Sequence, residues 1–185
     1  MAGNSSLTLK DFFGNSDYEK FEIPMYQRSY SWTNGQLDEL WSDLENLDDE
    51  DNTTHFIGLF VMTEDESIKR RMQVVDGQQR ITSVSILLAV LRDLMWEIVN
   101  YEQEVGKGKI AFTISTEIGA LNKFLYAGNS NADTKLEPNE NDKEAYRDTI
   151  AWLGDEDDAR CAIFEKEIGK EPGERLTSEE IKIKN

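Results

Sequence analysis

The feature that most constrains the fold of this 185-residue chain is a junction between a strand and a long helix. Residues 72–75 fit a strand, and Gly77 then permits a tight turn with unusual backbone dihedrals. From residue 79 to about residue 101, apolar side chains recur every three or four positions, which predicts one long helix buried on most sides. The first turn of such a helix presents unpaired N–H groups at the positive end of its dipole and is therefore suited to bind an anion.

Arg80 lies in this first turn, where a positive charge is unfavourable by roughly 0.3–1 kcal/mol if it is exposed. We therefore expect a negative group nearby. Asp76 could supply it from within the protein, or a bound phosphate could supply it from outside. In the second case, further donors would come from the same turn: Gln78, Gln79, Thr82 and Ser83. The residues alone leave both interpretations open.

A second cluster of aromatic and polar side chains follows Pro24. If the chain is extended here, alternate side chains point to opposite sides. One side would carry Tyr26, Arg28, Tyr30 and Trp32, and the other Gln27, Ser29 and Ser31. The aromatic side suits base stacking combined with a phosphate contact. Ordinary aromatic packing explains the same stripe and is favoured when this cluster is taken by itself.

The remaining patterns predict a mixture of strands and helices. Residues 7–13 fit a helical turn or a strand, residues 21–23 a strand end, and residues 56–62 a buried strand. Thr33 and Gln36 have the spacing of a capping box and introduce an amphipathic helix. Further along we expect a strand at 110–114, a helix at 118–126, a surface loop or linker at 128–142, and helices at 144–153, at 159–168 and from 178 onward.

Composition excludes several kinds of chemistry. Cys161 is the only cysteine and His55 the only histidine, so an internal disulfide and a Cys/His zinc site are both ruled out. A Ser-His-Asp triad would require His55, for which a structural or merely exposed role is favoured. No apolar stretch approaches the length of a membrane span, and the N-terminus has no features of a signal peptide, so we expect a cytoplasmic protein without a membrane partner.

The net charge of −17 bears on the choice of partners. Surfaces that bind DNA are usually basic, because Lys and Arg displace counterions from phosphates. Non-specific DNA affinity is therefore not expected to be the leading property of this chain. The acidic runs are best explained as solvated surface.

Taken together, the two clusters resemble a known family. The order is Ile-Pro-x-Tyr-Gln-Arg-x-Tyr-x-Trp at 23–32, Phe-Ile-Gly at 56–58, and Val-Val-Asp-Gly-Gln-Gln-Arg-Ile-Thr-Ser at 74–83. This order closely resembles the N-terminal domain family of GmrSD-type modification-dependent restriction enzymes over about residues 7–101. Residues 135–139 with Tyr146 look like a weaker second landmark of that family. Ile81 and Ser83 stand where many relatives have Leu and Thr, which are conservative differences.

The resemblance implies a ParB/sulfiredoxin-like α/β (α+β) fold. It predicts a nucleotide-binding core with a small mixed sheet and packed helices over residues 1–105. A mainly helical extension over 106–185 would follow, truncated before a C-terminal domain. In the family, the Asp-Gly-Gln-Gln-Arg motif is associated with NTP binding and hydrolysis. No Walker motif is present, so a P-loop mechanism is excluded.

Site residues carry over by position. Asp76, Gln79 and Arg80 would be catalytic, with Asp76 as a Mg²⁺ ligand or water-orienting group and Arg80 neutralising phosphate charge. The nucleotide, of unspecified type, would be bound by Tyr26, Gln27, Arg28, Tyr30, Trp32, Gly77, Gln78, Thr82 and Ser83.

The function implied is regulatory. The domain would bind and turn over NTP and so license a C-terminal nuclease domain or a partner subunit, in bacterial defence against phage DNA carrying modifications. Modified DNA would be engaged through the full-length protein. A His-Asn-His nuclease needs a second histidine, which this chain lacks, so cleavage by these residues alone is not expected. Two alternatives stay open: a non-catalytic binding module for nucleotide or modified DNA, and an acidic interaction or inhibitor protein.

Overall fold

The computed structural model describes residues 8–14, 17–48, 54–65, 68–127 and 133–151. Its sheet has four short strands in the order β2-β3-β1-β4. β1 (Lys20–Glu22) lies in the middle and runs parallel to β3 (Arg71–Asp76) and to β4 (Leu136–Glu137). β2 (Val61–Glu64) pairs with β3 as an antiparallel hairpin. The predicted small mixed sheet with packed helices, and hence the α/β fold class, is confirmed.

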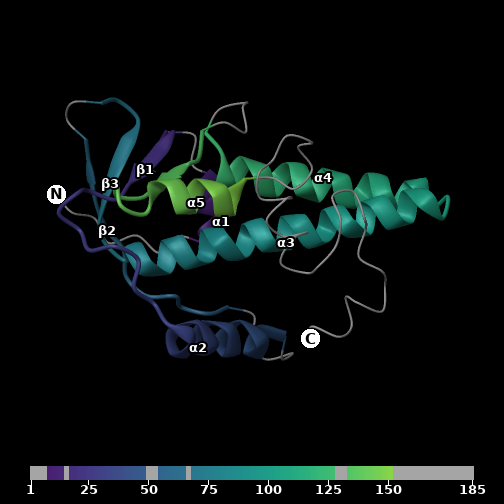
Figure 1. Ribbon diagram of the computed structural model, residues 1–185, viewed down its shortest axis with the longest axis horizontal. Coiled ribbons are helices and arrows are strands. Elements are labelled where there is room, and N and C mark those ends of the chain that lie inside the picture. Colours follow the sequence, from purple (N-terminus) through teal and green to yellow (C-terminus); the bar gives the residue numbers. More distant parts are fainter. Residues whose placement is uncertain (1–7, 15–16, 49–53, 66–67, 128–132, 152–185) are drawn as a thin grey trace.

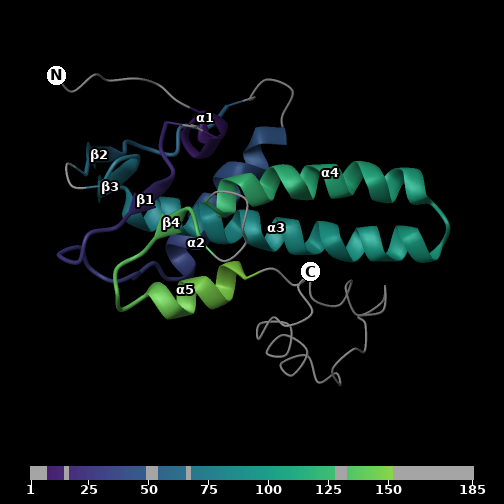
Figure 2. The ribbon, with the colours of Figure 1, turned by 90° about the horizontal axis from the view of Figure 1, so that it is seen from above.

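Helices cover the sheet and extend beyond it (Figures 1 and 2). The two longest, α3 (Gln78–Glu104) and α4 (Gly108–Leu125), form an antiparallel hairpin whose closed end points away from the sheet. Shorter helices complete the fold: α1 (Leu9–Gly14), α2 (Asn34–Glu45), the 3₁₀ turn η1 (Asn46–Asp48) and α5 (Lys143–Ile150). The sheet therefore lies at one end of an elongated helical layer.

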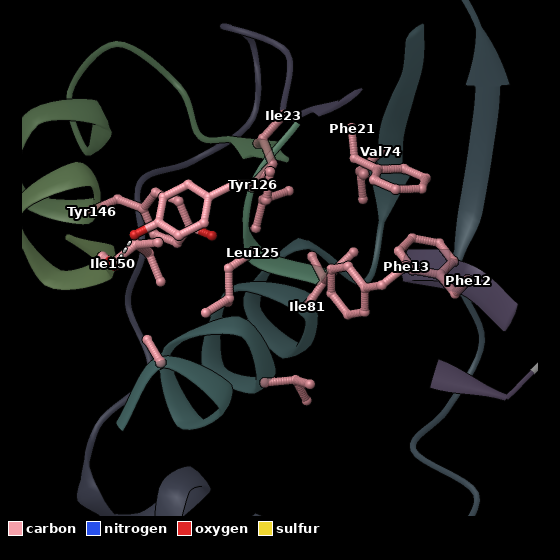
Figure 3. Packing of buried hydrophobic residues seen from close by; sticks show 13 residues of the cluster. Phe12, Phe13, Phe21, Ile23, Val74, Ile81, Leu125, Tyr126, Tyr146 and Ile150 are labelled. Atoms are coloured by element: carbon pink, nitrogen blue, oxygen red, sulfur yellow. Dashed lines mark hydrogen bonds between the residues drawn. The ribbon is translucent and has the colours of Figure 1, made fainter. Parts of the chain in front are cut away.

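The main core lies between the sheet, α1, α5 and the first half of α3. Figure 3 shows three phenylalanines gathered beside β1 and β3, with the Phe12 and Phe21 rings stacked at a centroid distance of 4.3 Å. Val74 and Ile81 are fully buried against this cluster. Because Val74 precedes Gly77 and Ile81 follows it, burial on both sides fixes the direction in which α3 leaves the sheet.

A buried arginine fastens α5 to the long helix. Arg92 of α3 is fully buried and donates to the Tyr126 hydroxyl (3.1 Å) and to the carbonyls of Ile150 (3.0 Å) and Ala151 (3.1 Å). Its Nε also donates to Asp93 Oδ1 at 2.9 Å. These carbonyls end α5 without helical partners, and Arg92 supplies hydrogen bonds to both of them.

The local predictions around the strand–helix junction are confirmed. β1 stops two residues before Pro24, β3 ends at Asp76, and the Gln36 side chain accepts the Thr33 N–H at 2.9 Å at the start of α2. The long helix is present, but the prediction that it is buried on most sides is wrong. Its second half leaves Leu94 and Ile98 exposed, and α2 has no buried residue at all. Periodicity identifies an apolar face but does not say how much of it another element covers.

The buried strand predicted at residues 56–62 is also wrong. Phe56 is 74 % exposed, Leu59 is exposed as well, and only residues from Val61 onward pair with β3, at the edge of the sheet. The carbonyls of Ile57 and Leu59 accept hydrogen bonds from Arg80 instead of from a neighbouring strand. The Arg80 side chain therefore supplies the hydrogen bonds that a neighbouring strand would otherwise supply.

Two predictions after residue 105 need correction. Residues 110–114 form the first part of α4 instead of a strand, because Ala111 and Ile118 lie on one helical face that packs on Val99 of α3. Residues 128–142 are not simply a loop, since β4 lies within them and pairs with β1. The boundary expected at residue 105 falls in the α3–α4 turn, and elements on both sides of it share the sheet and the core.

α5 confirms the helix expected at 144–153, although it ends at Ile150. The helices expected at 159–168 and from 178 lie outside the described residues, as does Cys161.

Candidate functional site

The junction between β3 and α3 is built around Gly77. This residue has a φ of +90°, a region that strongly favours glycine, and the Asp76 Oδ1 accepts its N–H at 2.8 Å. A Cβ on Gly77 would lie 2.5 Å from the Phe60 ring. α3 begins at Gln78, so the N–H groups of its first turn face the end of the sheet without helical partners.

The segment after Pro24 is held against this first turn by side chains of α3. Gln79 binds it twice, accepting the Ser31 N–H at 2.7 Å and donating to the Ser29 carbonyl at 3.2 Å. The Tyr30 hydroxyl lies 2.7 Å from Ser83 Oγ. The amide of Gln79 thus acts as a clamp that brings the two sequence clusters together.

Two more bonds complete the attachment. Gln27 donates to the Val75 carbonyl at 2.8 Å, at the end of β3. Gln78 Nε2 lies 3.4 Å from the Arg28 carbonyl, a long contact that nevertheless sets the orientation of the amide, because the flipped amide would place two acceptors together. Gln27, Gln79 and Ser83 therefore position the segment.

A cavity of about 280 Å³ opens between this segment, the start of α3 and the start of α5. That size lies just below the range of ligand pockets, which span roughly 300–1,000 Å³, so the cavity would enclose part of a nucleotide. The described residues that line it are Ile23, Arg28, Tyr30, Gln78, Gln79, Thr82, Ile86, Pro138, Asn139, Asp142, Ala145, Tyr146 and Thr149.

Two side chains at the pocket, those of Gln78 and Arg28, have polar groups that are not fully paired within the described part of the protein. Gln78 is only 8 % exposed, and its Oε1 has no hydrogen-bond partner in the described part of the protein. A buried acceptor in this condition costs roughly 1–3 kcal/mol until something donates to it. Arg28 is exposed at the pocket and forms no ion pair with any described residue.

The third wall comes from residues 138–149. Asp142 Oδ2 accepts the Tyr30 N–H at 2.7 Å, and Asn139 donates to the Gln27 carbonyl at 3.3 Å. Tyr146 is buried, and burial raises the pKa of its hydroxyl, which donates to Ser85 Oγ. Sequence reasoning marked Asn139 and Tyr146 only as a landmark and missed Asp142. The position of Asp142 just before a helical pattern was the sequence signal that could have identified this residue.

Arg80 points to a different part of the molecule. Its Nη1 donates to the Ile57 carbonyl at 2.9 Å and its Nη2 to the Leu59 carbonyl at 3.0 Å. The guanidinium lies 5.4 Å from the centroid of the Phe60 ring, and Gly58 adopts a φ of +104° beside it. The pairing with Asp76 considered above is not formed.

The structure thus brings five predicted site residues to one pocket and places others elsewhere. Arg28, Tyr30, Gln78, Gln79 and Thr82 line it. Gln27 and Ser83 hold the segment from behind. The remaining predicted residues are not among the described residues that line it: Tyr26 (72 % exposed), Trp32, Asp76, Gly77 and Arg80.

No group of three or more His, Cys, Asp or Glu side chains that could hold a metal ion occurs among the described residues. Asp76 as a Mg²⁺ ligand stays a prediction. The single histidine, His55, is partly buried and lies 3.3 Å from Asp43, and it is not among the residues that line the pocket. Within the same part of the chain, no helix is both long and apolar enough to cross a membrane.

Fold and site together define a small α/β domain with a pocket at the point where a strand, a glycine turn and a helix start meet. Comparison with known families gives the more particular result. The chain matches the model of the GmrSD restriction endonuclease N-terminal domain over residues 9–182, and it belongs to that family. It is accordingly a domain of a restriction system. A comparison with curated proteins finds no match.

Proposed function

We propose that this domain is an NTP-binding regulatory domain of a modification-dependent DNA restriction system, and that the pocket at the start of α3 binds the nucleotide. One observation carries the proposal. Two sequence clusters about 50 positions apart, chosen for their chemistry, contribute Arg28, Tyr30, Gln78, Gln79 and Thr82 to the same cavity.

The chemistry of the pocket fits this ligand class. Tyr30 offers a flat face on which a base can stack, Arg28 offers a charge for phosphate, and Gln78 Oε1 offers an unused acceptor. The helix start contributes further N–H groups. Apolar walls with a few convergent polar groups are the usual composition of a small-molecule site.

Hydrolysis is the second part of the proposal, with Asp76, Gln79 and Arg80 as the groups that would carry it and Mg²⁺ as the ion. Gln79 lines the pocket, but Asp76 and Arg80 do not. Arg80 would have to turn away from the carbonyls of residues 57 and 59 to reach a phosphate there. Binding and turnover are therefore expected to depend on different arginines.

The test is calorimetric titration of the full chain with ATP, GTP, CTP and UTP in Mg²⁺. Arg28→Ala should weaken binding by about ten- to a hundredfold, the range for one charged hydrogen bond of roughly 1.5–3 kcal/mol. Arg147→Ala, which removes an equally charged but exposed side chain on α5, serves as the control and should bind like the wild type.

Phosphate-release assays on the same samples separate the two parts of the proposal. Arg80→Ala should bind nucleotide but lose turnover. Binding without any phosphate release in the wild type would establish a non-catalytic module. A folded wild-type chain that gives no heat with any of the four nucleotides would overturn the proposal.

A further inference from the structure

A second cavity, of about 420 Å³, lies between α1, the β2–β3 turn and the end of α4. It shares no lining residue with the pocket described above. The described residues that line it are Lys10, Gly14, Tyr18, Glu19, Arg70, Ala120, Lys123, Phe124, Ala127 and Lys135. Four of these side chains are positively charged and one is negatively charged.

This balance is opposite to that of the chain, which has 37 acidic and 20 basic residues. Glu19 pairs with Arg70 at 3.7 Å. The three lysines form no ion pair with any described residue, although acidic side chains are plentiful. Residues 15–16 and 128–132, which flank the cavity in sequence, contain no acidic residue either. Positive charge is therefore concentrated at this cavity, and within the described part of the chain its three lysines have no carboxylate partner.

Lys135 makes the cavity more than a patch of solvated lysines. It is only 8 % exposed, and its one described partner is the Phe13 carbonyl, to which Nζ donates. Burial, and secondarily the charge of Arg70, lowers the pKa of its ammonium group. A buried cation without a counter-ion is costly, so a position with a purely packing role would favour an apolar side chain.

The backbone conformation of Arg70 also supports a ligand site at this cavity. Arg70 is the one non-glycine residue with positive φ, +64°, in the described part of the chain. Its carbonyl accepts the N–H groups of Glu19 (2.7 Å) and Lys20 (3.3 Å), which hold the turn in this conformation beside the cavity. Backbone strain of this kind costs on the order of 1–3 kcal/mol and occurs preferentially at ligand sites.

We propose that this cavity, defined here as the basic pocket, binds a phosphate-type anion, with Lys135 at its buried end and Lys10, Lys123 and Arg70 around its opening. Lysines act as point charges toward phosphate, and several of them around one cavity suit a multiply charged anion. Tyr18 and Phe124 add apolar walls. The anion comes either from a small phosphate compound or from the backbone of a nucleic acid strand. The proposal does not depend on nucleotide binding at the start of α3.

Two probes distinguish these sources. Pyrophosphate is titrated by calorimetry, and a short fluorescent DNA duplex is titrated by anisotropy over a series of NaCl concentrations. The test variant is Lys10→Ala/Lys123→Ala, because both side chains are exposed and neither holds the fold together. The matched control is Lys107→Ala/Lys109→Ala, which removes the same charge from the far end of the α3–α4 hairpin (Figure 2).

Binding of either probe should weaken at least tenfold in the test variant and stay within about twofold in the control. For DNA, the slope of log K against log salt should also fall by about 2, since each phosphate contact contributes about 0.9. Lys135→Met, checked for folding by circular dichroism, should give the same loss.

Loss confined to pyrophosphate identifies a small-anion site, and loss of DNA binding identifies a strand site. The proposal is overturned if the wild type binds neither probe, or if the control loses as much affinity as the test variant.

Discussion

At the scale of single residues, the main finding is that the residues of the Asp-Gly-Gln-Gln-Arg motif contact different parts of the molecule. Gln79 clamps the segment after Pro24, while Gln78 keeps an unpaired acceptor in the pocket. Arg80 holds residues 57 and 59 on another side. Consecutive residues on a helix point about 100° apart, so neighbours in one motif serve different neighbours in space.

Glycine substitutions test the junction at this scale. Gly77→Ala should lower the free energy of unfolding by about 1–3 kcal/mol, because φ is +90° and the new Cβ would meet the Phe60 ring. Gly35→Ala has open space around it in the first turn of α2 and should raise stability by up to about 1 kcal/mol. Urea unfolding of both variants measures the difference, and a loss in both would contradict this account.

At the scale of elements, α5 completes the pocket, although its own helix is only two turns long. An isolated helix of eight residues is not stable in water, so α5 depends on tertiary contacts. Arg92 provides them by binding the carbonyls at its end, and the Tyr126 hydroxyl adds a bond to the Ile150 carbonyl at 2.7 Å. The third wall of the pocket at the start of α3 is thus held in place by contacts at the C-terminal end of α5.

Arg92→Ala should therefore reduce the free energy of unfolding by about 3–5 kcal/mol, the typical cost of breaking a buried charged network from one side. Arg92→Lys should recover part of the loss, since one ammonium group cannot reach all four acceptors of Arg92. Arg147→Ala, at an exposed position, should cost under about 1 kcal/mol. Chemical denaturation gives these values. An Arg92→Ala variant as stable as the control would show that α5 is held by other contacts.

At the scale of the whole molecule, one carboxylate joins the sheet to the helical layer. Glu137 on β4 pairs with Lys143 of α5 at 2.7 Å and lies 3.8 Å from Lys20 of β1. Burial alone would raise the pKa of the Glu137 carboxyl, but the hydrogen bond and charge of Lys143 and the neighbouring cations outweigh it. The net effect lowers the pKa.

Because the folded carboxyl has the lower pKa, its contribution to stability is complete above the ordinary value of 4.5 and is lost as the pH falls through the folded value. Glu137→Gln should be less stable than the wild type at neutral pH and should lose less stability on acidification below 4.5. Glu117→Gln, which removes an exposed glutamate of α4 without a described ion pair, should follow the wild-type profile. Thermal unfolding measured across this pH range tests the prediction. Parallel profiles of stability against pH for the Glu137 variant and the wild type would refute it.

The sequence alone determined the strand–glycine–helix junction, the capped start of α2 and the family. These features depend on neighbouring residues: a glycine that permits a positive φ, a side chain three positions from its partner, and an apolar period. Five of the predicted site residues meet for a different reason: the two clusters follow strands β1 and β3, and these strands pair in the tertiary structure.

Only the tertiary structure decided which groups are left without partners. The exposure of Phe56 and Leu59, the carbonyl partners of Arg80 and the third wall of the pocket at the start of α3 all depend on contacts between distant segments. The basic pocket combines residues from 10 to 135, of which only Lys135 belongs to a landmark of the family in sequence. Burial and charge compensation are properties of the assembled surface, and local patterns of residues do not encode them.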